Sequence, residues 1–342
     1  MRLSRQIKVL GLCAILGTLV TPRITSACSV AFWNNNKEAK TVARTMDLYM
    51  SDEPLMLLYP RGMERKGNVG DNSAQWKSKY GSVVVTAFHS DAASDGMNEA
   101  GLAGHMLYLD GTEYEKRDAS KPAISNALWL QYALDQYKTV PEAIEGLRKV
   151  QVMSVKIGGK EWPIHLALED EKGDSAIFEF IHGKMIVHQG PEYNVMTNEP
   201  AFEIQLANLK KYKLFGGKLP MPGDVNPLSR FVRAASYLKT LPQPKNYVEA
   251  VAGVMSVIRT TMVPFGAEDT SGAKFVDSWP TRWVSLQDLT QKIFYYNYTQ
   301  APNVFWVDYK NLNFKEGSLV LQLDPTSVAL SGEVSNSLKP AK

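Results

Sequence analysis

The sequence predicts an α+β protein in which antiparallel sheets are layered with helices. Segments with the pattern of strands come in three blocks, and helices lie between the blocks rather than after each single strand. This order fits antiparallel sheets better than alternating βαβ units. The chain of 342 residues shows no internal repeat and no long low-complexity linker. We therefore expect residues 28–342 to form one large domain.

The first block consists of short apolar or alternating runs bounded by Asn, Gly and Asp, a pattern typical of strands. Strands are expected at 28–33, 41–46, 55–59, 82–89 and 102–109. Between residues 122 and 137 the apolar spacing changes to that of a largely buried helix. A second helix is expected at 140–150, with Pro141 in its first turn, where the missing N–H has no helical partner to lose.

The rest of the chain contains a strand meander, a group of helices and a closing strand block. The meander is expected at 152–157, 164–168, 175–181 and 185–188. Helices are expected at 203–209, 227–238 and 247–259, followed by strands at 282–286, 292–298, 304–307 and 319–323. A polar tail is expected from about residue 331.

Residues 1–27 have the three-part pattern of a secretory signal peptide. Arg2, Arg5 and Lys8 precede an apolar run at 9–20, and a polar stretch then ends in small residues. The apolar run is shorter than the roughly 20 residues needed to span a bilayer. We therefore expect cleavage and export to the periplasm or medium, with no stable membrane insertion.

Cleavage after Ala27 would make Cys28 the first residue of the mature chain. Because Cys13 would leave with the leader, Cys28 would be the only thiol, and no intramolecular disulfide could form. A first-residue cysteine holds a nucleophile and an amine base on one carbon, which indicates an amide-hydrolysing enzyme. Two alternatives stay open. Cys28 is a buried structural cysteine, or it carries lipid in a non-catalytic ligand-binding lipoprotein, although Thr25 fits the lipoprotein pattern poorly.

The composition excludes several other classes. A net charge of +3 with 21% charged residues is ordinary for a globular protein and gives no sign of nucleic-acid binding. The five histidines have no metal-ligand spacing, and the chain has neither a phosphate-binding loop nor a Gly-x-Ser-x-Gly elbow. We therefore expect no metal and no cofactor.

The segment CSVAFW at 28–33, followed by ARTMD at 43–47, resembles the start of the choloylglycine hydrolase family. This family contains penicillin V acylases and conjugated bile salt hydrolases, and Arg44 and Asp47 stand at its spacing from the cysteine. Further blocks follow in family order: NEAGL (98–102), VMTNEP (195–200), PGD (222–224), SRFVR (229–233) and TRWVSLQD (281–288). The resemblance implies the N-terminal nucleophile fold, a four-layer αββα sandwich of two antiparallel sheets.

The resemblance also implies catalytic roles. Cys28 would attack an amide carbonyl as a thiolate and form a thioester. Arg44 would hold the thiolate by its charge, and Asp47 would bind the amine that shuttles the proton. Asn198 would donate to the oxyanion of the tetrahedral intermediate. Arg230 would add positive potential around that intermediate.

Four further positions concern the choice of the second arginine and the shape of the substrate pocket. Arg233, one turn after Arg230, is the rival for the second arginine. Met46 and Tyr108 are expected to bind substrate, since a flexible thioether adapts to apolar groups and a tyrosine ring favours a flat acyl group such as phenoxyacetyl. The backbone N–H of Tyr108 could be a second oxyanion donor. Leu48 stands where many members have tryptophan, so one aromatic wall is expected to be missing.

These observations predict an exported amidohydrolase that acts on a small-molecule amide. We expect it to cleave the side-chain amide of penicillin V or the amide of a conjugated bile salt. An N-acyl homoserine lactone acylase is the alternative among enzymes. The connection between Asn198 and Arg230 is short, and longer insertions there support tetramers in Gram-positive members. A homo-oligomer, either dimer or tetramer, therefore stays open.

Overall fold

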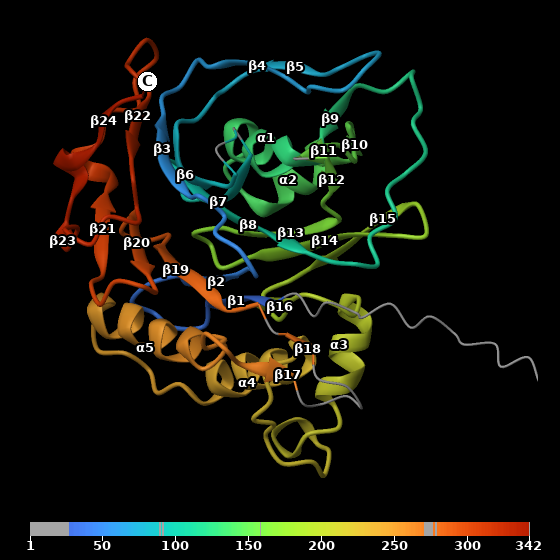
Figure 1. The fold of residues 1–342 in the computed structure, drawn as a ribbon, viewed down its shortest axis with the longest axis vertical. Helices are drawn as coiled ribbons and strands as arrows, with labels where there is room; N and C mark the ends of the chain where they lie inside the picture. Colours follow the sequence, from blue (N-terminus) through green and yellow to red (C-terminus); the bar gives the residue numbers. More distant parts are fainter. Residues whose placement is uncertain are drawn as a thin grey trace, which may run out of the picture.

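The computed structural model describes residues 27–88, 90, 92–157, 159–269, 276–277 and 279–341. Within them, two large sheets lie face to face between two layers of helices (Figure 1). The predicted α+β class and the αββα arrangement are therefore confirmed. The expected signal peptide up to residue 26, which includes Cys13, lies outside the described residues, as does His89.

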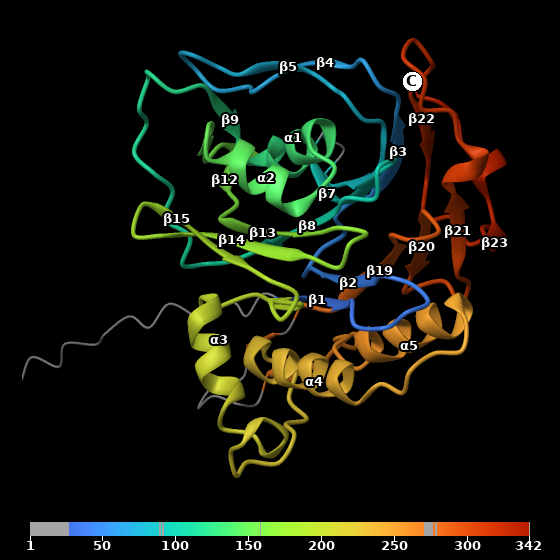
Figure 2. The same cartoon turned by 180° about the vertical axis from the view of Figure 1, so that it is seen from behind.

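Seven strands form the sheet that carries Cys28. In spatial order they are β16 (Val195–Thr197), β1 (Ala27–Trp33), β2 (Thr41–Asp47), β19 (Thr281–Asp288), β20 (Ile293–Tyr298), β21 (Phe305–Asp308) and β23 (Gly332–Glu333). Neighbours are antiparallel except for the last pair. Helices α4 (Pro227–Thr240) and α5 (Tyr247–Arg259) cover the outer face, and α3 (Phe202–Leu209) packs beside α4 (Figure 2).

Nine antiparallel strands form the second sheet. In spatial order they are β15 (Lys184–Gln189), β14 (Ser175–Ile181), β13 (Ile164–Glu169), β8 (Ala103–Tyr108), β7 (Ala93–Asn98), β6 (Ser82–Thr86), β3 (Leu55–Tyr59), β22 (Leu321–Leu323) and β24 (Lys339–Pro340). Helices α1 (Trp129–Gln136) and α2 (Val140–Leu147) cover its outer face. The two sheets thus enclose one apolar core with α4 and α5, and α1 and α2 close a second core.

Short elements complete the described chain. Two-stranded pairs are β4 (Glu64–Lys66) with β5 (Gln75–Lys77), β9 (Ala123–Ser125) with β10 (Gln151–Met153), β11 (Lys156–Ile157) with β12 (Lys160–Glu161), and β17 (Glu268–Asp269) with β18 (Val276–Asp277). Single 3₁₀ turns lie at Asn126–Leu128, Lys213–Phe215, Tyr309–Asn311 and Ser335–Ser337. In the described part of the chain, no helix combines the length and apolar character needed to cross a bilayer.

Some expected elements differ from those observed. The helix expected at 122–137 begins only at Trp129, because the backbone of β9 pairs with β10 instead. Strand β7 was missed, since its Ser94, Asp95 and Gly96 are residue types typical of turns. The polar tail expected from residue 331 adds β23 and β24 to the sheets. Edge strands pair through their backbones, so they do not require apolar side chains.

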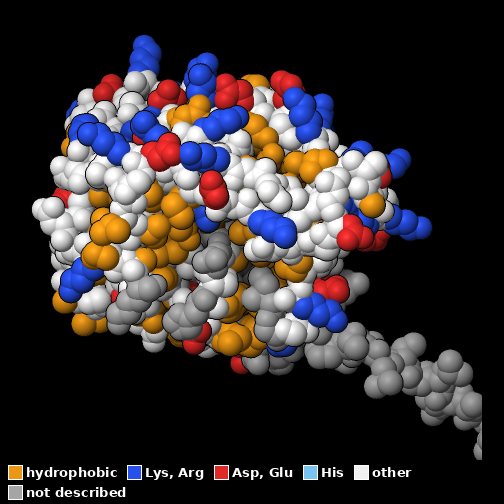
Figure 3. Space-filling view, turned by 90° about the horizontal axis from the view of Figure 1, so that it is seen from above, with side chains coloured by type: hydrophobic (Ala, Val, Ile, Leu, Met, Phe, Trp, Pro, Cys, Tyr) orange, Lys and Arg blue, Asp and Glu red, His pale blue; other side chains and the backbone are white. Residues whose placement is uncertain are grey.

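The surface carries charges of both signs. Figure 3 shows Lys and Arg side chains interspersed with Asp and Glu on the face seen there. The charged side chains visible on that face thus form no single field of one sign.

A pair of glycines lets α1 approach the second sheet, and this generates a first prediction. Gly96 and Gly104 lie opposite each other in β7 and β8. A Cβ at Gly104 would lie 2.5 Å from Leu130 Cδ1 and 2.6 Å from Leu168 Cδ2, and both leucines are fully buried. Gly104→Ala should lower the free energy of unfolding by about 1–3 kcal/mol because it overpacks the core. Urea denaturation measures this change.

Gly111→Ala is the matched control. A Cβ there meets no atom within 4 Å, so its effect should stay within about 0.5 kcal/mol. Equal effects of the two substitutions would contradict the close packing inferred at Gly104.

Candidate active site

The pairing of three strands places Cys28 at the centre of the site. Cys28 in β1 lies opposite Met46 in β2. On the other side of β1, Ser29 pairs with Thr197 in β16. Asn198 follows β16 and therefore comes level with Cys28. Cys28 and Asn198, which are 170 positions apart in the sequence, are thus brought into direct contact by the pairing of β1 with β16.

The Cys28 thiol is buried against the end of β2. Its Sγ lies 3.5 Å from the backbone nitrogen of Asp47 and 3.8 Å from the carbonyl oxygen of the same residue. Burial raises the pKa of the thiol, while the positive charges of Arg44 and Arg230 oppose that rise. The two cations therefore offset only part of the effect of burial, and the pKa of the thiol stays above its ordinary value.

Arg230 connects the segments that meet at Cys28. It lies in the first turn of α4, which begins with Pro227 after the capping residue Asn226. Its Nη1 donates to the Cys28 carbonyl oxygen at 2.6 Å and to Ser29 Oγ at 2.7 Å. Its Nη2 donates to Asn198 Oδ1 at 3.2 Å. The guanidinium thus holds in place the backbone of Cys28, the proposed nucleophile, and the side chain of Asn198, the proposed oxyanion donor.

Arg233 points elsewhere. It donates to the backbone carbonyls of Thr260 and Asp224, and also to that of Pro222. The geometry therefore places Arg230 at Cys28, and its rival in the sequence supports the loop before α4 instead.

Asn198 is fully buried and uses both ends of its side chain. Its Oδ1 accepts the backbone N–H of Cys28, and its Nδ2 donates to the carbonyl oxygen of Tyr108 at 2.7 Å. The peptide bond to Ala27 is present in this chain, so the Cys28 nitrogen is an amide here. Its hydrogen goes to Asn198 rather than to Asp47, which the sequence analysis expected to bind that nitrogen as an amine.

Arg44 reaches from β2 toward the second sheet. Its Nη1 donates to the Ser94 carbonyl oxygen at 2.6 Å, and its Nη2 donates to that of Met106 at 3.0 Å. The guanidinium also lies 4.9 Å from the ring centroid of Trp283. Both donors are thus directed to carbonyls of the second sheet, and Arg44 affects the Cys28 thiol through its charge.

Asp47 is a fully buried carboxyl group beside the start of β1. Its Oδ2 accepts a hydrogen bond from Thr45 Oγ1 at 3.1 Å and lies 3.8 Å from Arg230 Nη1. Burial raises its pKa to about 7, although the Arg230 charge opposes the shift. Asp47 therefore changes charge near neutral pH.

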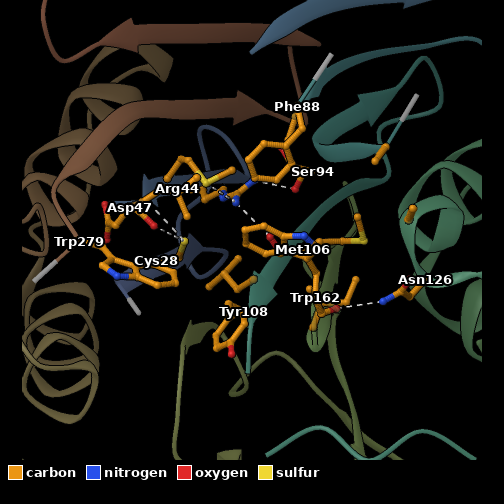
Figure 4. A pocket seen from close by; sticks show the side chains of 17 residues that line it. Cys28, Arg44, Asp47, Phe88, Ser94, Met106, Tyr108, Asn126, Trp162 and Trp279 are labelled. Atoms are coloured by element: carbon orange, nitrogen blue, oxygen red, sulfur yellow. Dashed lines mark hydrogen bonds between the residues drawn. The ribbon is translucent and has the colours of Figure 1, made fainter. Parts of the chain in front are cut away.

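A mainly apolar pocket opens in front of Cys28 (Figure 4). It encloses about 670 Å³, including its open mouth, which lies within the range of small-molecule sites. The lining residues are Cys28, Arg44, Met46, Asp47, Leu48, Ala87, Phe88, Ala92, Ser94, Met106, Leu107, Tyr108, Asn126, Ala127, Trp162, Ile164 and Trp279. Five of the seven predicted site residues belong to this set, whereas Asn198 and Arg230 contact Cys28 without being among the lining residues.

Three aromatic residues of the pocket escaped the sequence analysis. Trp279 packs with Leu48 and faces Tyr108, with ring centroids 5.8 Å apart. Phe88 and Trp162 form a second pair, with centroids 4.9 Å apart. The wall expected to be missing at Leu48 is thus supplied by Trp279 from a distant segment. The sequence contains one feature common to two of these residues. Trp162 and Trp279 are each followed by a proline, and a strand begins directly after that proline.

The four-layer fold, with a cysteine that faces a pocket from an interior strand of one sheet, defines the class of N-terminal nucleophile hydrolases. Among the described residues, no three His, Cys, Asp or Glu side chains are grouped to hold a metal ion.

Comparison with known proteins identifies the family within this class. Residues 28–322 match the family described as linear amide C–N hydrolases, choloylglycine hydrolase family. A penicillin V acylase from Pectobacterium atrosepticum is 34% identical over 363 aligned positions, which cover 96% of this chain and 95% of the relative. The chain therefore belongs to the choloylglycine hydrolase family, and it is a hydrolase of linear amide C–N bonds.

Solved structures agree with this assignment. The structure of penicillin V acylase from Agrobacterium tumefaciens superposes with a TM-score of 0.82 at 37% identity, covering 92% of this chain and 98% of that one. A variant of conjugated bile acid hydrolase from Clostridium perfringens shares the fold, with a TM-score of 0.73 at 22% identity over 89% of this chain and 98% of its own.

The raised pKa of Asp47 leads to a prediction about stability. Its pKa is 3.8 in an unperturbed chain and about 7 in the folded protein. Between these values the folded state binds more protons than the unfolded state, so stability should fall as the pH rises. Asp47→Asn cannot titrate and should remove this dependence, up to about 1.4 kcal/mol per pH unit.

The measurement is urea unfolding from pH 4 to pH 7 on chains that keep a residue before Cys28. Parallel stability curves for the wild type and Asp47→Asn would show that this carboxyl group does not titrate in the range.

Proposed function

We propose that this protein is an exported amidase whose nucleophile is Cys28, freed at its amino group by removal of residues 1–27. One observation carries the proposal. The buried thiol faces an apolar pocket, while two arginines and one asparagine converge around it from other elements. The arginine charges favour the thiolate, and the pocket provides room for the acyl group of an amide. The mature enzyme then acts in the periplasm or outside the cell.

The chemistry follows from the atoms around the thiol. The free α-amine takes the thiol proton, and Sγ attacks the amide carbon to give a tetrahedral oxyanion. Asn198 donates one Nδ2 hydrogen to the Tyr108 carbonyl, which leaves its second hydrogen for the oxyanion. The backbone N–H of Tyr108 is the proposed second donor. When the C–N bond breaks, the α-ammonium protonates the leaving amine, and water then hydrolyses the thioester.

Removal of the leader changes the surroundings of Asp47. The new α-ammonium has more hydrogens than the amide that now bonds Asn198, and the buried Asp47 carboxylate lies at the same strand end. A positive charge there favours the ionised carboxylate. Asp47 is therefore proposed to orient the amine that moves the proton.

The pocket favours the phenoxyacetyl side chain of penicillin V as the acyl group. Tyr108 and Trp279 present one pair of rings and Phe88 and Trp162 another, and aromatic pairs of this kind accept a flat ring between or against them. Two relatives that are 34% and 37% identical are penicillin V acylases. Conjugated bile salts and N-acyl homoserine lactones are the competing substrates that the experiment below compares.

Cys28→Ser tests the nucleophile. Because a hydroxyl ionises far less readily than a thiol, hydrolysis of penicillin V should fall by at least about a thousandfold, with the fold unchanged by circular dichroism. Undiminished turnover would overturn the assignment.

The wild-type enzyme is assayed in parallel on penicillin V, glycocholate and a long-chain acyl homoserine lactone. We expect the highest kcat/KM for penicillin V, whereas faster hydrolysis of either other substrate would reassign the acyl group.

Mass spectrometry of the mature N-terminus should find an unmodified cysteine. A diacylglycerol on that residue would instead indicate a lipoprotein.

Asn198→Ala tests the oxyanion role. Loss of one such donor should lower kcat by about 100- to 1,000-fold and change KM much less. Asn126→Ala is the control, because Asn126 lines the same pocket but donates to Tyr114 and Trp162. That substitution should change KM more than kcat. If Asn198→Ala also changes only KM, Asn198 is not the oxyanion donor.

A further inference from the structure

A buried cluster of charges lies between the two sheets, outside the pocket. Asp95 in β7 and His105 in β8 are opposite each other, with Oδ1 and Nδ1 2.5 Å apart. Glu169 in β13 places its Oε2 3.3 Å from His105 Nε2. Gln287, from β19 of the other sheet, donates to Asp95 Oδ2 at 3.1 Å. None of these four side chains has more than slight exposure.

The surroundings of Asp95 and His105 favour the charged form of each side chain. Burial opposes charge on His105, but the nearby carboxylates Asp95 and Glu169 raise its pKa to about 9. Burial also opposes charge on Asp95, yet His105 holds the pKa of Asp95 below its usual value. Arg44 and the buried tyrosines Tyr296 and Tyr309 also face Asp95. Removing both charged groups from water costs free energy, so an ion pair in this position adds little to stability. We therefore assign its role to the geometry that it imposes on the two strands.

This pair is the last matched position between β7 and β8. The two strands are in register from the pair of Met97 and Ala103 to the pair of Asp95 and His105, where the pairing ends. The next residue on β7 is Ser94, and the next on β8 is Met106. Their carbonyl oxygens accept hydrogen bonds from the two ends of the Arg44 guanidinium instead, at 2.6 and 3.0 Å. Arg44 therefore sits where the two strands separate (Figure 4).

We propose that Asp95 and His105 are positioning residues: they fix the register of β7 and β8 so that both carbonyls converge on Arg44, which holds its charge beside Cys28. This inference rests on the proposed function, in which the thiol of Cys28 reacts as a thiolate. It adds residues that touch neither substrate nor thiol. Gln287 strengthens the effect, since it ties Asp95 to the sheet that carries Cys28.

Asp95→Asn tests the proposal. Loss of the ion pair should loosen the two carbonyls and displace Arg44. We expect kcat for the preferred amide to fall by about ten- to a hundredfold, with KM within about twofold. The rate of Cys28 alkylation by iodoacetamide, measured against pH, should shift to higher pH because the thiolate loses part of its cationic support.

Asp135→Asn is a closely matched control. Asp135 is also fully buried, pairs with Arg65 at 2.9 Å and accepts a hydrogen bond from Gln131 at 2.7 Å. It belongs to α1, on the opposite face of the second sheet from Arg44. The same substitution there should cost stability in thermal unfolding but leave kcat and the alkylation profile unchanged.

The outcomes separate the two proposals. If Asp95→Asn behaves like Asp135→Asn, the positioning role is overturned while the proposed function stands. If the wild type hydrolyses none of the amides, the proposed function fails, yet the alkylation profiles still decide the positioning role. Should Asp95→Asn not fold, the double variant Asp95→Asn with His105→Gln removes both charges together, and the same readouts apply to it.

Discussion

The guanidinium of Arg230 joins elements that are distant in the sequence, and the arrangement around Cys28 depends on it. A buried cation is stable only where its donors are satisfied. Here they meet the Cys28 carbonyl, Ser29 Oγ and Asn198 Oδ1, while the Asp47 carboxyl lies 3.8 Å away. Because these partners come from three separate segments, namely β1, the end of β2 and the residue after β16, the arginine sets the geometry of the site as well as its charge.

A second buried arginine, Arg44, lies beside the same thiol on the neighbouring strand β2 and reaches toward the second sheet. Arg44 donates its hydrogen bonds to carbonyls of β7 and β8, and its charge acts on the thiol as well as on nearby buried carboxyl groups such as Asp47 and Asp95. Burial raises the pKa of the Cys28 thiol, and the charges of Arg44 and Arg230 oppose that rise. The protein thus places an apolar pocket and two cations around one sulfur, and the apolar surroundings strengthen the effect of each charge.

The pocket and the charged apparatus come from different parts of the fold. Strands β1, β2 and β16 and helix α4 carry the groups around the thiol. The aromatic walls come instead from segments that lead into strands, at Phe88, Trp162 and Trp279. Loops tolerate change better than paired strands. The groups around the thiol thus lie mainly on paired strands and a helix, whereas the aromatic walls lie on connecting segments.

The sequence by itself determined the fold class, the single described cysteine and the candidate residues near it. These depend on local patterns and on short motifs such as ARTMD, which can be read without a structure. The sequence already favoured Arg230 over Arg233, and the tertiary structure added the contacts of Arg230 with Cys28 and Asn198. Only the tertiary structure found Trp279 as the wall beside Leu48 and revealed the buried Asp95–His105 pair. Such contacts depend on strand register and on packing between sheets, and residue spacing along the chain does not encode either in a form that can be read directly.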